Sequence, residues 1–256
     1  MYFNKADEIF HTAEKLEKQI QGTDNGSMDN LDDWCSTGEA YKFIAGIILY
    51  NAVDDFRSIF ILLEHNLFNG AFLSLRRLFE LNVDLKFIGK NPKIRSKEFL
   101  MFGEIQRGAF LKIREKYLEK PTIDTKRKEN ILADYKKAMD ALGYKDLSKP
   151  PQKWARESWF KKCKEIKWLK YYEMVYELCC SYTHPNAKGF GSFIKPLPNG
   201  DLGYIEPEIL LHIIAPLAMG LILGIMDDVN KIFNAGLEIE INNIYEKIRP
   251  TNLDVI

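Results

Sequence analysis

The chain has 256 residues, of which 46% are hydrophobic, so it is long enough for one elaborated domain and too apolar for a disordered protein. Its 36 Lys and Arg residues balance its 36 Asp and Glu residues, so the totals predict no bulk attraction to nucleic acid. The N-terminus has no basic segment followed by an apolar run, so we expect no secretory signal and a cytoplasmic location.

Long helical patterns follow one another along the chain. Ser36 and Glu39 have capping-box spacing at the start of a long apolar helix, and Asn69-Gly70 separates it from the next helix. The predicted helices cover residues 4–21, 36–68, 71–88, 97–118, 124–142, 171–182, 207–234 and 239–248. A turn signature at 198–201 predicts a small hairpin or irregular loop near residues 190–205.

These elements predict an all-α fold class, a multi-helix bundle around a long helical hairpin. We expect residues 1–35 to form an N-terminal helix and loop, and residues 36–256 to form a single bundle domain. The apolar stretch 209–226 is at the short limit for a membrane span and contains Pro216, so we expect a buried helix and no membrane insertion.

Charged side chains interrupt the otherwise apolar helix over 71–88. Arg76 projects within about 40° of Phe72 and Phe87, and Glu80 lies one turn further on. Such an i,i+4 pair is either a buried or half-buried ion pair that fixes helix register or the polar wall of a site. In the second interpretation Arg76 and Glu80 are catalytic, and Arg77 on the adjoining strip binds substrate.

A second polar cluster ends the helix over 171–182. Tyr176 and Cys180 are spaced by four, and His184 continues this stripe where Pro185 should stop the helix. An imidazole at a helix end can be a structural clasp or a general acid or base. In the catalytic interpretation His184 acts on a substrate that is bound by the three polar residues near it, Tyr176, Ser181 and Asn186.

Metal and cofactor sites have little support. Cys179 and Cys180 beside His184 offer too few ligands for a closed zinc site, so we expect no metal and no cofactor. The four cysteines show no C-x-x-C spacing, and we expect buried free thiols.

The segment 112–170 is basic, with 18 Lys and Arg residues against 9 Asp and Glu residues. Tyr and Trp residues alternate with these charges, a composition that suits single-stranded RNA. The alternative is a solvated helix face whose aromatic rings pack inward.

Two spaced motifs carry a resemblance. Arg76-x-Leu-x-Glu80, followed by Tyr176-x-Leu-x-Cys-x-Tyr-x-His184-Pro, resembles a bacterial family of all-helical proteins, domain of unknown function 5677. The resemblance covers residues 36–233. The family usually has Ser four residues before the His, whereas this chain has Cys180 there.

More distantly, the arrangement resembles HEPN domains, many of which are metal-independent ribonucleases of defence and toxin systems. Their motif places Arg five to seven residues before His on one helix, and no histidine of this chain has such an Arg. The resemblance therefore implies that Arg76 or Arg77 approaches His184 across the bundle.

Together these features predict a HEPN-like protein that binds RNA or a nucleotide, or a metal-independent ribonuclease, in a defence or stress system. The alternative is a non-catalytic helical interaction module with a structural Arg76/Glu80 pair, whose partner is a second copy or another protein.

Overall fold

The computed structural model describes residues 2–21, 30–117, 123–183, 194–196, 201–204 and 207–248, and its fold class is all-α, as the sequence predicts. The chain divides into two compact units. Unit 1 comprises Met1–Thr23, Lys42–Phe87 and Trp159–Ile256, and unit 2 comprises Asp24–Tyr41 and Ile88–Ser158. The expected division into 1–35 and 36–256 follows other boundaries and stays a prediction.

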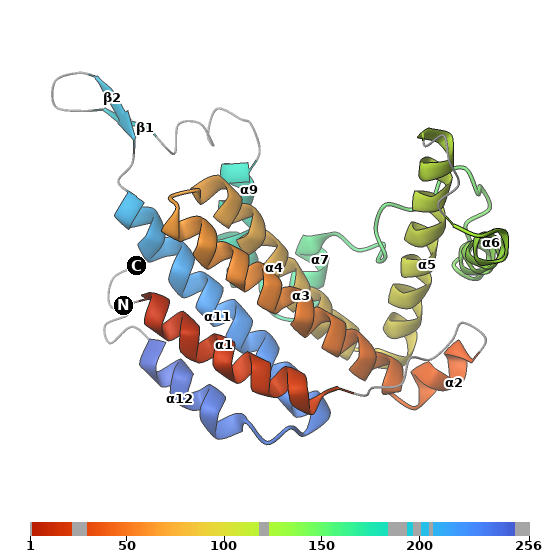
Figure 1. Ribbon diagram of the computed structural model, residues 1–256, viewed down its shortest axis with the longest axis horizontal. Coiled ribbons are helices and arrows are strands. Elements are labelled where there is room, and N and C mark those ends of the chain that lie inside the picture. Colours follow the sequence, from red (N-terminus) through yellow and green to blue (C-terminus); the bar gives the residue numbers. More distant parts are fainter. Residues whose placement is uncertain are drawn as a thin grey trace. The chain divides into compact units, whose positions relative to one another are not determined.

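Unit 1 is a bundle of long helices (Figure 1). The amphipathic helix α1 packs on α11 and α12 and buries Ile9 and Leu16 completely. The helices are α1 (Tyr2–Gln19), most of α3 (Glu39–Glu64) and α4 (Phe68–Gly89), α7 (Trp159–Glu165), α8 (Leu169–Tyr171), the π-helical η1 (Tyr172–Tyr176), α9 (Glu177–Thr183), α11 (Pro207–Phe233) and α12 (Glu238–Ile248).

A two-stranded ribbon precedes α11. β1 (Ile194–Pro196) pairs antiparallel with β2 (Leu202–Tyr204), so the hairpin expected near residues 190–205 is present. Residues 197–200, between the strands, lie outside the described residues.

α3 and α4 form the predicted helical hairpin, and the ion pair between Asp55 and Arg77 joins the two helices. The reversal between them differs from the expectation. Asn66 adopts a left-handed φ of 56°, which asparagine tolerates at a helix C-terminus, and the chain turns there. Asn69-Gly70, the expected break, lies instead in the first turn of α4.

The apolar helix α11 packs against α4. It is the one helix among the described residues that is long and apolar enough to cross a membrane, and 56% of its most apolar window is buried within the protein. The fully buried Asn82 donates its side-chain amide to the Leu221 carbonyl at 2.8 Å, and Lys86 pairs with Asp228. The middle and C-terminal part of α11 is therefore core, as expected.

Unit 2 consists of α2 (Leu31–Ser36) beside α5 (Pro92–Tyr117), with α6 (Thr125–Ala141) packed along α5. Asp124 caps α6 by accepting from the Arg127 N–H at 2.9 Å. α6 lies close to α5 at Gly108. A Cβ there would stand 2.5 Å from the Cβ of Tyr135, so only glycine fits without a shift.

Two helix starts differ from the prediction. α5 begins at Pro92, five residues early, because proline suits the first turn of a helix. α3 begins at Glu39 without the expected capping box. Ser36 ends α2 instead, and its hydroxyl donates to the Asp32 carbonyl at 2.7 Å.

Candidate functional site

Three charged side chains stand one turn apart on α4: Arg76, Glu80 and Asp84. Positions i, i+4 and i+8 project to the same side of a helix. Nε of Arg76 donates to Oε1 of Glu80 at 3.0 Å, which confirms the predicted pair. The two side chains are 24% and 26% exposed, so this pair is half-buried at the edge of the core.

The same guanidinium reaches η1. Nη2 of Arg76 donates to the Tyr176 hydroxyl at 3.0 Å, and its central carbon lies 4.9 Å from the centroid of that ring. Burial raises the pKa of Tyr176 to about 12, so the phenol stays protonated at neutral pH. Its oxygen accepts from Arg76, and its O–H remains a donor. The contact joins the two polar clusters of the sequence.

Aromatic rings surround the Arg76–Tyr176 contact. Tyr172 stacks on Tyr176 with 5.0 Å between centroids, and the rings of Phe79 and Trp159 lie 5.9 and 6.2 Å from Tyr176. In this environment burial raises the pKa of the Glu80 carboxyl, although Arg76 opposes the shift. Glu80 therefore releases its proton less readily than an exposed glutamate.

A buried ion pair that sequence reasoning missed extends the cluster to α7. Nζ of Lys162 lies 2.7 Å from Oδ1 of Asp84, and the side chains are only 5% and 13% exposed. The ammonium also lies 4.2 Å from the centroid of Trp159. An aspartate in an apolar helix, such as Asp84, predicts a cationic partner. No local sequence feature, however, distinguishes Lys162 from the other 17 basic residues of 112–170.

The backbone is irregular where it carries the tyrosines. η1 is a π-helical turn between α8 and α9, and it holds both Tyr172 and Tyr176. Such turns insert a residue into the helical ladder and occur frequently at functional sites. The side chains and the backbone thus mark the same region of unit 1.

The other predicted site residues do not join this cluster in the described part of the chain. Arg77 turns to α3, where its Nη1 lies 3.3 Å from Oδ1 of Asp55. The Ser181 hydroxyl donates to the Glu177 carbonyl of its own helix at 2.9 Å. His184 and Asn186 lie outside the described residues. Their roles, and that of Arg77 in binding substrate, stay predictions.

The thiols are free, and Cys35, Cys163 and Cys179 are buried as expected, whereas Cys180 is only partly buried. Burial raises the pKa of Cys179 to about 12, so this thiol is a poor nucleophile. Within the described ranges, no three His, Cys, Asp or Glu side chains gather as a metal site would require.

The aromatic rings of the basic segment mostly pack inward, as the alternative interpretation expects. Tyr135 is almost fully buried, and Trp154 packs edge-on against Phe99 with 5.3 Å between centroids. Trp159 contributes to the Tyr176 cluster. Tyr117 and Phe160 remain exposed, so stacking surfaces for RNA are fewer than the sequence indicates.

In a comparison with protein families, the model of a family described as "Family of unknown function (DUF5677)" matches residues 42–201. The matched region includes both polar clusters. Comparisons with curated proteins and with solved structures find no match.

Proposed function

The chain belongs to this family of unknown function, and we propose that it is a HEPN-like, RNA-binding protein of the metal-independent ribonuclease type, acting in a bacterial defence or stress system. One observation carries the proposal: Arg76 crosses from α4 to donate to Tyr176, eight residues before His184. The HEPN resemblance implies that Arg76 or Arg77 approaches His184, and the contact with Tyr176 supports Arg76 as that arginine.

The chemistry needs three groups. His184 would take the proton of a ribose 2′-hydroxyl, whose oxygen attacks the adjacent phosphorus while the 5′-oxygen departs. The departing oxygen would receive a proton from a second donor; the Tyr176 hydroxyl is protonated at neutral pH, although its raised pKa makes it a weaker acid than an ordinary phenol. Arg76 would stabilise the charge that develops on the phosphate, and Glu80 would hold the guanidinium in place.

Cleavage of a labelled single-stranded RNA tests this proposal. His184→Ala should abolish cleavage, and Arg76→Lys should reduce it by about 10²–10³-fold, because lysine keeps the charge but loses the planar donor geometry. Arg57→Lys is the matched control, since Arg57 forms an exposed ion pair with Asp54 in the same unit. Cleavage should persist in chelator. Equal cleavage by the parent and His184→Ala would contradict the catalytic assignment.

A second candidate is the non-catalytic interaction module. It is favoured by the fact that protein groups already hold the Arg76 guanidinium, through Glu80, Tyr176 and the rings around them. Under this candidate Arg76→Lys lowers the urea midpoint, and the parent shows neither cleavage nor affinity for single-stranded RNA at low salt. Light scattering would then show whether the partner is a second copy or another protein.

A further inference from the structure

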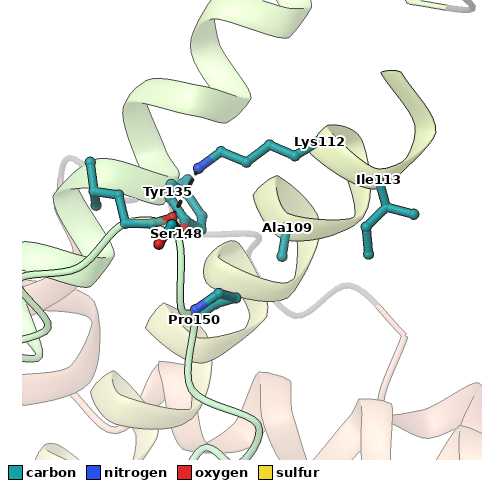
Figure 2. A pocket seen from close by; sticks show the side chains of 7 residues that line it. Ala109, Lys112, Ile113, Tyr135, Ser148 and Pro150 are labelled. Atoms are coloured by element: carbon teal, nitrogen blue, oxygen red, sulfur yellow. Dashed lines mark hydrogen bonds between the residues drawn. The ribbon is translucent and has the colours of Figure 1, made fainter. Parts of the chain in front are cut away.

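Unit 2 contains a groove of about 530 Å³ between α5 and the segment that follows α6 (Figure 2). Ala109 and Ile113 of α5, together with Pro150, form its apolar walls. The volume is within the range of about 300–1,000 Å³ that is typical of small-molecule sites. It is separate from the Arg76 cluster, which belongs to unit 1.

A cation is held at the edge of this groove. Nζ of Lys112 lies 3.9 Å from the centroid of Tyr135 and donates to the Leu147 carbonyl at 3.2 Å (Figure 2). The Tyr135 hydroxyl donates to the same carbonyl at 2.6 Å. An ammonium has three N–H groups, and the ring face and the carbonyl engage two of them. The third can bind an anionic or carbonyl oxygen of a ligand.

Large apolar side chains remain exposed on α5 beside the groove. Phe110, Ile113 and Tyr117 are spaced by three and four residues, and each is more than half exposed. Nζ of Lys116 lies 5.1 Å from the centroid of Tyr117. Exposed rings and cations thus alternate along the C-terminal half of one helix.

Lys112 is the charged residue of the groove lining, and the chain segments that supply the lining are rich in basic residues. Residues 107–117 and 123–158 contain 13 Lys and Arg residues against 7 Asp and Glu residues. A polyanion is therefore the complementary partner. Among polyanions, single-stranded RNA also supplies flat apolar faces, which stack on exposed rings and fill apolar walls.

We infer that the groove lined by Ala109, Lys112, Ile113 and Pro150 is a subsite for one unstacked base of single-stranded RNA. The neighbouring phosphates contact the basic residues of α5 and α6. The inference rests on RNA as the ligand of the proposed function, and it adds a binding surface in unit 2 that is independent of His184.

Fluorescence anisotropy of labelled oligouridylate and oligoadenylate at low salt tests the subsite. Ile113→Glu should weaken the affinity by about ten-fold or more, because loss of one base contact is worth about 1–3 kcal/mol. Ile94→Glu is the matched control. Both isoleucines are on α5 and 55% exposed, and they lie about 28 Å apart along the helix axis. Lys112→Gln should lower the slope of log affinity against log salt by about one.

Photo-crosslinking with 4-thiouridine RNA provides a readout that needs no variant, and the crosslinked peptide should come from α5 between residues 107 and 117. Equal weakening by Ile113→Glu and Ile94→Glu, with crosslinks elsewhere, would overturn the subsite and leave RNA binding by the protein intact. RNA that binds the groove but is never cleaved would overturn the ribonuclease proposal and leave the subsite intact. Binding of polyglutamate, and not RNA, in a manner that depends on Ile113 would replace the subsite with an acidic peptide groove.

Discussion

Replacing Lys162 by methionine should destabilise unit 1 strongly. The substitution keeps much of the apolar stem that packs beside Trp159, but it removes the charge 2.7 Å from Asp84. Asp84 is only 13% exposed, so its buried carboxylate would lose Lys162, the cation with which it forms this ion pair. Removing one partner of a buried pair typically costs about 3–5 kcal/mol of unfolding free energy.

Urea denaturation followed by tryptophan fluorescence and circular dichroism measures this cost. Lys231→Met is the matched control, because Lys231 pairs with Asp227 at 2.6 Å but is 64% exposed, and its loss should cost at most about 0.5 kcal/mol. Adding Asp84→Leu to Lys162→Met should restore most of the stability, since an apolar pair can replace a buried ion pair. Equal midpoints for the two lysine variants would refute the claim that burial determines the cost.

Three further predictions concern other contacts. Glu80→Ala should lower the free energy of unfolding by about 2 kcal/mol, a value between those for buried and surface ion pairs. This loss should exceed that of Lys126→Ala, and equal urea midpoints for the two variants would show that Glu80 is effectively solvated. Burial raises the pKa of Asp55 to about 6. The folded state therefore binds the Asp55 proton more tightly than the unfolded state does. The free energy of unfolding should fall by about 2–3 kcal/mol as pH rises from about 4 to about 7. Asp55→Asn should remove this component, and an unchanged pH dependence of the urea midpoint would contradict the assignment. Gly108→Ala should lower the free energy of unfolding by about 1–3 kcal/mol, because the added Cβ would meet α6 at 2.5 Å. Gly103→Ala on the same helix has open space around it and should raise the free energy of unfolding by about 0.5–1 kcal/mol. Thermal unfolding measures both, and two changes of the same sign would contradict the packing argument.

Local patterns in the sequence are sufficient to predict most helices and the Arg76–Glu80 pair of the candidate site. The helical periods predict the all-α class, and the i,i+4 spacing predicts the Arg76–Glu80 pair, because both depend only on the 3.6-residue repeat of a single helix. The turn signature likewise predicts the ribbon of β1 and β2. Helix ends are less certain from sequence, since Asn66 and Asn69-Gly70 both have turn composition and only one of them reverses the chain.

Tertiary packing alone decides which distant side chains meet. Arg76 reaches Tyr176 across 100 residues, and Asp84 selects Lys162 across 78 residues from among many cations. Both choices follow from which faces of α4, α7 and η1 pack together, a property of the assembled core that no local period encodes. The groove of unit 2 depends in the same way on the close approach of α5 and α6. Gly108 permits this approach, and burial of the Tyr135 ring stabilises it.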